Sequence, residues 1–103
     1  MRMRQGFNPN EVGAPICRFP SGQLAFGPWR QGDPMGVSVT TQCPNGSQFW
    51  GIYHTHPRGV PMPSDQDIKS GVESKARVLC INATSPANPQ GKMRCFVRGN
   101  LAG

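Results

Sequence analysis

The chain has 103 residues, enough for one compact domain with a single hydrophobic core and too few for two such domains. Its 13 glycines and 11 prolines, with only 16% charged residues, indicate a turn-rich fold and exclude a long-helix protein. The net charge of +6 is spread along the chain without a basic cluster interleaved with aromatic residues, so binding to nucleic acid is not expected. An acidic protein partner, or solubility alone, explains the charge equally well.

The first half of the chain predicts several short strands. They cover residues 10–18, residues 24–29, the alternating residues 37–41 and an apolar run that ends at His54. Pro15 interrupts the first of these strands, which indicates either an edge strand or a bulge. Residues 30–36 form a loop, and Asn45-Gly46 signals a hairpin turn before the strand with the histidines.

The second half predicts one main helix followed by two strands. The helix covers about residues 64–75 and buries Ile68, Val72 and Ala76, which are spaced by four residues. Residues 78–81 and 95–97 form the two last strands, with a long connection over residues 82–91. No apolar run reaches the roughly twenty residues of a membrane span. The basic segment Met1–Phe7 has no apolar region behind it, unlike a signal peptide, so we expect a cytoplasmic protein that does not enter a membrane.

The four cysteines contain no Cys-x-x-Cys pair, so a zinc site bound by cysteine is not expected. Core packing is the simplest role for all of them. Cys80 and Cys95 lie in two apolar runs, and they can face each other across paired strands and form a disulfide if the compartment is oxidising. The sequence leaves open the disulfide state of Cys17, Cys43, Cys80 and Cys95.

The chain's two histidines, His54 and His56, stand two residues apart at the end of an apolar run. Residues two apart in a strand project from the same face, so both imidazoles can reach one ion. With Asp67 they offer two nitrogens and one carboxylate oxygen, which suits zinc with a fourth position open for water. Structural zinc sites are usually closed by four protein ligands. The three ligands therefore predict one catalytic zinc ion per chain and hydrolytic chemistry.

Each part of this pattern also has a simpler explanation. Ser64 and Asp67 match a capping box, which by itself would only start the helix. A His-x-His pair in a strand can be an ordinary surface pair. The joint occurrence of all four positions favours the metal site. The two roles of Asp67 are compatible, because an anion in the first turn gains from the helix dipole while it binds the metal.

The complete pattern is His54-x-His56, then seven residues, Ser64, two residues and Asp67. It resembles the signature of the JAMM metalloproteases, also called JAB or MPN+. The prolines after the second histidine and before the serine resemble the prokaryotic branch of that family, which includes the RadC-type proteins. The resemblance implies a compact α+β (mixed α/β) domain over residues 1–103. Such a domain has a mixed β-sheet or partial barrel and one main helix after the His-x-His strand.

The resemblance further implies a catalytic glutamate on an early strand, followed closely by a small residue and a glycine. Glu11 matches that position, with Gly13 after it. Asp33 lies in a loop without a scaffold, and Glu73 points away from the ion, so neither replaces it. Glu11 would then take a proton from the zinc-bound water and return it to the departing amine, while Ser64 donates a hydrogen bond to the oxyanion. The alternative for Glu11 is a solvated carboxylate at a strand end.

Members of that family mostly cleave peptide or isopeptide bonds next to ubiquitin-like proteins, and some trim sulphur-carrier proteins. The resemblance thus implies a zinc-dependent, deubiquitinase-like peptidase or isopeptidase with such a protein tail as substrate. Residues 29–36 would border the groove for an extended tail. One alternative is a toxin-associated or phage-associated peptidase. Another is a RadC-like binding module that metal stabilises and that cuts no bond, although Glu11 and Ser64 disfavour it.

Overall fold

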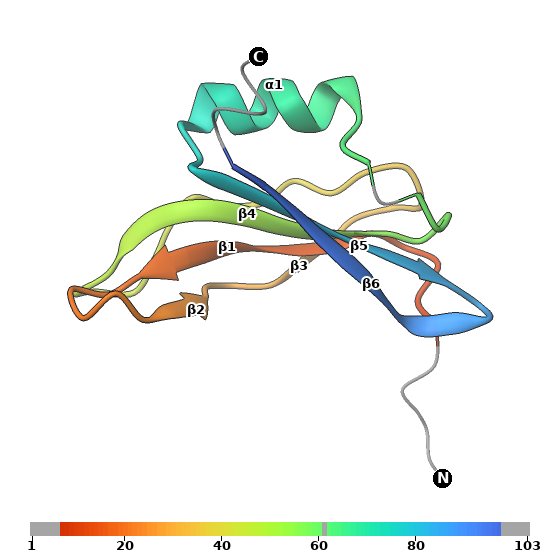
Figure 1. The fold of residues 1–103 in the computed structure, drawn as a ribbon, viewed down its shortest axis with the longest axis horizontal. Helices are drawn as coiled ribbons and strands as arrows, with labels where there is room; N and C mark the ends of the chain where they lie inside the picture. Colours follow the sequence, from red (N-terminus) through yellow and green to blue (C-terminus); the bar gives the residue numbers. More distant parts are fainter. Residues whose placement is uncertain (1–6, 61, 98–103) are drawn as a thin grey trace, which may run out of the picture.

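A curled, mixed β-sheet with a helix on one face forms the part of the chain that the structure, a computed structural model, describes, residues 7–60 and 62–97 (Figure 1). The strands are β1 (Val12–Arg18), β2 (Leu24–Phe26), β3 (Arg30–Gln31), β4 (Gln48–His56), β5 (Val78–Ser85) and β6 (Asn88–Val97), and the helix is α1 (Asp65–Ser74). The sheet order is β2-β1-β4-β5-β6, with β3 also paired to β1. The predicted α+β class with one main helix after the histidine strand is confirmed. The basic segment Met1–Phe7, which we expected not to be a signal peptide, lies outside the described part up to residue 6.

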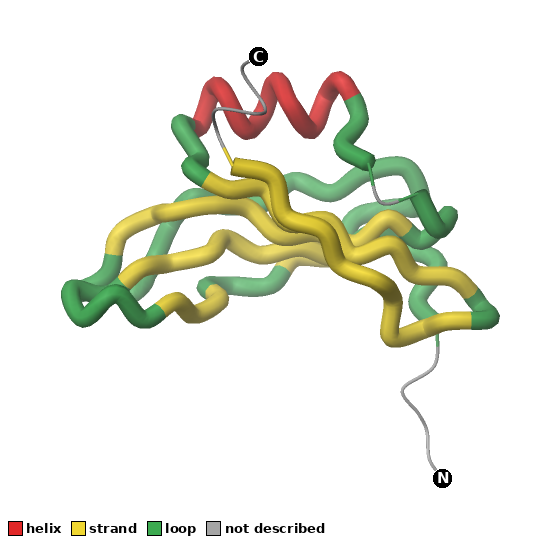
Figure 2. Tube along the Cα trace, viewed as in Figure 1, coloured by secondary structure: helices red, strands yellow, loops and turns green. Residues whose placement is uncertain are grey.

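The parallel pair β4 and β5 determines where the helix lies. Parallel neighbours need a crossover connection, and α1 provides it between the end of β4 and the start of β5. The other strand pairs are antiparallel. The long connection between β3 and β4, yellow in Figure 1 and green in Figure 2, runs along the same side of the sheet as α1. No helix within the described residues is long and apolar enough to cross a membrane.

The hydrophobic core lies between α1 and the sheet. It contains Ile52, Ala76, Leu79 and Ile81, with Val39, Phe49 and Phe96 packed against it. The prediction that Val72 is buried was wrong, because its side chain is 53% exposed, and Gly71 is the buried residue of the helix instead. Val72 follows Asp67 by five residues, about 140° further around the helix. Since Asp67 faces the sheet, Val72 turns to solvent.

For Pro15 the sequence left open an edge strand or a bulge, and the second alternative is confirmed. β1 is an interior strand, with β4 on one side and β2 and β3 on the other, so Pro15 does not mark an edge. The register of β1 against β4 shifts one residue after Pro15, between Ile16 and Cys17. The predicted strand over residues 37–41 was wrong, because residues 37–44 form no strand, and residues 30–31 of the predicted loop form β3. The turn at Asn45-Gly46 is present but does not close a hairpin, since the residues directly before it form no strand.

All four cysteines form disulfides. Cys80 on β5 pairs with Cys95, directly opposite on β6, as the sequence allowed. The second bond joins Cys17 on β1 to Cys43, which the sequence did not indicate. That bond holds the unpaired 37–44 segment to the sheet. The last two strands are also longer than predicted, because β5 and β6 continue to a short turn after Ser85 and form one hairpin.

Gly13 on β1 allows the 37–44 segment to approach the sheet. A Cβ atom at this position would lie 2.7 Å from Val39 Cγ2 and 2.8 Å from the Tyr53 carbonyl oxygen. We expect Gly13→Ala to lower the free energy of unfolding by about 1–3 kcal/mol, the usual cost of overpacking. Gly36→Ala is the matched control, because a Cβ there meets nothing within 4 Å. Denaturant unfolding of both variants measures the difference, and equal stability would contradict this packing.

Candidate metal centre

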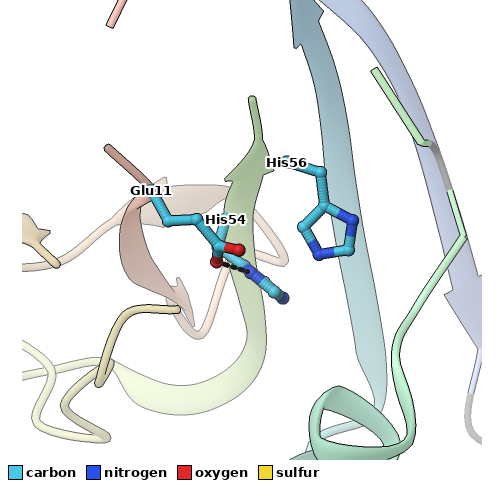
Figure 3. A group of neighbouring side chains, drawn as sticks. All are labelled: Glu11, His54 and His56. Carbon is cyan, nitrogen blue, oxygen red and sulfur yellow. Dashed lines mark hydrogen bonds and ion pairs between the residues drawn. The ribbon is translucent and has the colours of Figure 1, made fainter. Parts of the chain in front are cut away.

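The two histidines lie together beneath the start of the helix. β4 continues to His56, two residues beyond its predicted end, so both residues are part of one strand and project from its α1 side. Their rings are nearly perpendicular, with centroids 5.0 Å apart. Figure 3 shows the Glu11 carboxylate joined to His54, with the His56 ring beside them. His54 and His56 therefore lie on one face of the strand, as predicted.

One nitrogen of each histidine is occupied by a neighbouring oxygen. His54 Nδ1 lies 3.2 Å from Glu11 Oε1, and His56 Nδ1 lies 2.9 Å from the Val60 carbonyl oxygen. Since each Nδ1 can donate a proton to these acceptors, Nε2 is the nitrogen of each ring that can offer a lone pair to a metal. Metal-binding histidines usually have such a partner, which fixes the tautomer and the ring orientation. Val60 was not identified from the sequence, because a backbone carbonyl leaves no residue-type signal.

Asp67 faces the Nε2 atoms of both rings. Its Oδ2 lies 3.0 Å from His56 Nε2, and its Oδ1 lies 3.4 Å from His54 Nε2. The same carboxylate accepts a hydrogen bond from the Ser64 backbone N–H at 2.8 Å, while Ser64 Oγ accepts one from the Asp67 N–H at 3.1 Å. Ser64 and Asp67 therefore form a complete capping box at the start of α1. The helix cap and the contact with the histidines coexist.

Glu11 lies at the same site, held by its own backbone. Its N–H donates to the Asp33 carbonyl at 2.9 Å, and its carbonyl accepts from the Gly32 N–H at 2.8 Å. Only 7% of Glu11 is exposed, so it is not a solvated strand-end carboxylate. The loop around Asp33 is also better braced than the sequence suggested, because Asp33 Oδ1 accepts from the N–H groups of Met35 and Gly36. Asp33 therefore supports Glu11 through its backbone carbonyl.

Two sets of three residues could hold a metal ion. The first is Glu11, His54 and His56, whose ligand atoms lie within 4.8 Å of one another. The second replaces Glu11 by Asp67, the set that the sequence predicts. We favour the second set, because Glu11 occupies His54 Nδ1 whereas both Nε2 atoms face Asp67. Two imidazole nitrogens and a carboxylate, each with an outer hydrogen-bond partner, fit zinc with an open fourth position.

Charges at this site hold Asp67 ionised. Burial alone would raise the pKa of Asp67, but the hydrogen bond from His56, the charge of His54 and the hydrogen bonds from Ser64 together lower it to about 2. Conversely, the hydrogen bond to Asp67 raises the pKa of His56 above its usual 6.5, against the opposing effect of burial. A carboxylate that stays ionised is a ready ligand. The raised pKa of His56 means that protons compete with a metal at this residue.

Two cavities meet at the histidines. The larger, of about 430 Å³, lies between α1 and the segment from Met35 to Thr41, and His54, Ser64 and Asp67 are part of its wall. The smaller cavity, of about 280 Å³, has Glu11, His56 and Ser64 in its wall. Glu73 also lines the larger cavity, along the helix from Asp67, and it contacts neither histidine in the described structure.

Comparison with known proteins gives the family. The model of the family described as prokaryotic homologs of the JAB domain matches residues 25–97, so the chain belongs to this family. A JAB1/MPN domain protein from Archaeoglobus fulgidus has a similar fold, with a TM-score of 0.58 and 21% identity over 90% of this chain and 75% of that one. No curated protein matches the sequence. The family match includes both histidines, Ser64 and Asp67, while Glu11 precedes it.

The two candidate ligand sets predict different results for Asp67→Asn. We expect the parent to bind about one equivalent of zinc and Asp67→Asn to bind it at least about 100-fold more weakly, since loss of an outer partner alone costs 10–100-fold. His56→Ala should lose the metal as well. Asp65→Asn, which removes an exposed carboxylate from the same turn, is the control and should keep it. Zinc affinity by competition with a chelator decides, and full affinity in Asp67→Asn would favour the set with Glu11.

The paired charges predict the pH dependence of the metal-free protein. The contribution of Asp67 is complete above pH 3.8 and is lost as the pH falls toward about 2, because its pKa is lowered. The contribution of His56 is complete below pH 6.5 and is lost as the pH rises through its raised pKa. Stability from this pair should therefore be greatest between about pH 4 and 6.5. Thermal unfolding across pH should show this maximum in the parent and a flatter profile in Asp67→Asn.

Proposed function

We propose that the chain is a zinc-dependent peptidase or isopeptidase of the JAMM type. The observation that carries this proposal is the convergence of His54 Nε2, His56 Nε2 and the Asp67 carboxylate beside a buried glutamate, where two cavities meet. Family membership supports the assignment. His54, His56 and Asp67 would hold the zinc ion, which when bound polarises a substrate carbonyl and lowers the pKa of water.

Glu11 is the proposed proton carrier. Its Oε1 is engaged with His54 Nδ1, and among the described residues no hydrogen bond reaches its Oε2. One oxygen thus keeps the side chain in place while the other can accept a proton from water and deliver it to the departing nitrogen. The backbone hydrogen bonds to Gly32 and Asp33 fix the strand end from which Glu11 projects. This rigidity matters because a general base must stay within hydrogen-bond reach of the proton it takes.

Ser64 is the proposed oxyanion donor. Its Oγ accepts the hydrogen bond from the Asp67 N–H, and the hydroxyl hydrogen remains available to donate. Ser64 lines both cavities, so the hydroxyl lies at the place where a chain crossing the site would be cut. A donor of this kind contributes roughly 3 kcal/mol to stabilisation of the transition state.

The larger cavity suits an extended protein tail. Residues 37–41 belong to no strand, and within the described structure their backbone groups form no hydrogen bonds with other backbone groups. Such a free edge can pair with a peptide as an added strand. We propose that the tail of a ubiquitin-like or sulphur-carrier-like protein binds there, between this segment and α1. Residues 37–41 come directly after residues 29–36, the loop that we predicted to border the groove for such a tail.

A second candidate function is a metal-stabilised binding module without catalysis. The contact between Glu11 and His54 favours it, because a carboxylate that only orients a metal-binding histidine would lie in the same place. Such a module has no need for a hydroxyl donor at Ser64 or for Oε2 of Glu11 to be free. A toxin-associated or phage-associated peptidase would share the proposed chemistry and differ only in its substrate.

Glu11→Gln separates the enzyme from the binding module. The variant keeps an oxygen for His54 Nδ1 and loses the basicity, so hydrolysis should fall by about 10²–10⁴-fold, the usual value of a general base. Zinc content should stay near the parent value. The assay is zinc-loaded protein with a panel of ubiquitin-like fusions, and Asp65→Asn serves as the charge-matched control. Hydrolysis within about threefold of the parent would exclude Glu11 as the base and support a purely orienting role.

A further inference from the structure

The smaller cavity has a chemistry of its own, distinct from that of the larger one. Its volume is about 280 Å³, below the range of about 300–1,000 Å³ that holds drug-sized ligands. Its walls are mostly apolar and come from the Pro34-Met35 loop and from the residues that follow β4. A space of this size fits one amino-acid residue better than a folded partner or a long peptide.

The position of Glu11 tells which half of a substrate would enter this cavity. Glu11 lines the smaller cavity and is not part of the wall of the larger one. In the proposed reaction, on which this inference rests, Glu11 delivers its proton to the departing nitrogen, so that nitrogen must lie on the side of Glu11. The acyl half of the substrate then lies in the larger cavity, and the departing amine and the residue attached to it occupy the smaller one.

The walls of the smaller cavity indicate an apolar side chain. Met35, Val60 and Met62 line it, and each is at least half exposed although its side chain is apolar. Grouped exposed apolar side chains at a cavity are typical of a ligand site, whereas scattered ones are not. The two methionines are flexible and can adapt to side chains of different shape.

Arg58 adds a positive charge to the same cavity. It lines the cavity together with the apolar residues, and within residues 7–60 and 62–97 no acidic side chain forms an ion pair with it. A guanidinium group binds a carboxylate through two parallel hydrogen bonds. The cavity therefore offers a carboxylate for an amine at Glu11, apolar walls for a side chain and a guanidinium for a carboxylate. An α-amino acid with an apolar side chain carries all three complementary groups.

We propose that the smaller cavity is the subsite for a single apolar C-terminal residue, which the protein removes from the end of a peptide. The bond that breaks joins the preceding carbonyl carbon to the nitrogen of the last residue. Water supplies the oxygen of the new carboxylate, and its proton passes through Glu11 to the departing nitrogen. The products are a peptide shortened by one residue and a free apolar amino acid, whose carboxylate was already present and faces Arg58.

Ligand binding tests this subsite without turnover. Zinc-loaded protein is titrated with L-leucine, glycine and L-leucinamide, and the methyl signals of Met35, Val60 and Met62 are followed by NMR. Glycine has the same metal-chelating groups as leucine, so it accounts for direct binding to zinc. We expect leucine to bind at least tenfold more tightly than glycine, because of its apolar side chain, and at least tenfold more tightly than leucinamide, because of its carboxylate.

Arg58→Gln should remove the preference for leucine over leucinamide and keep the preference over glycine. Arg77→Gln is the matched control, since Arg77 stacks on the Trp50 ring and does not line the cavity. Equal binding of leucine and glycine by the parent would overturn the apolar subsite. Equal binding of leucine and leucinamide, or an unchanged preference in Arg58→Gln, would overturn the role of Arg58.

Hydrolysis provides a second, independent measurement. Peptides with the same sequence that end in a free leucine, in leucinamide or in leucine followed by two alanines are compared at equal concentration. We expect the free acid to be cut at least tenfold faster than the other two. Cleavage of all three at equal rates would overturn the subsite and leave the peptidase proposal standing. Selective binding of leucine without cleavage of any peptide would support the subsite and count against the peptidase.

Discussion

The carboxylate of Asp67 connects the two parts of the molecule on which the site depends. It caps the start of α1 through Ser64 and at the same time faces the Nε2 atoms of both histidines on β4. Because α1 is the crossover between the parallel strands β4 and β5, the same contact fixes how the helix is rotated over the sheet. The core beneath the helix, the outward position of Val72 and the cavity beside residues 35–41 all follow from that rotation.

A second constraint places Glu11. Gly13 pairs with His54 across β1 and β4, so Glu11, two residues before it, reaches the site from the neighbouring strand. The backbone of residues 32 and 33 holds Glu11 from the other side. Since the 37–44 segment continues from that loop and is tied back to β1 by the Cys17–Cys43 bond, the wall of the larger cavity and the proposed base share one support.

Several features of the fold were predictable because they depend on local patterns. The helix begins and ends within one residue of its predicted range, since Ser64 and Asp67 form a cap that four consecutive residues specify. The strand with the histidines was evident from its apolar run. The prediction of a strand at residues 37–41 was wrong, because alternation of side chains does not reveal whether a partner strand exists. For Pro15 the sequence left an edge strand and a bulge open, because the local sequence does not reveal pairing partners, and the register shift beside it decides for the bulge.

The sequence by itself determined the residues of the candidate site, His54, His56 and Asp67, with their spacing, and the cap that starts the helix. Strand periodicity and helix capping act over a few residues, so these features needed no knowledge of the rest of the fold. Only the tertiary structure decided which nitrogen of each histidine faces Asp67, that Glu11 is buried against His54, that Cys17 pairs with Cys43, and that two cavities meet at the site. Each of these depends on strand register or on a distant backbone group, and contacts between residues far apart in the chain are set by packing rather than by local pattern.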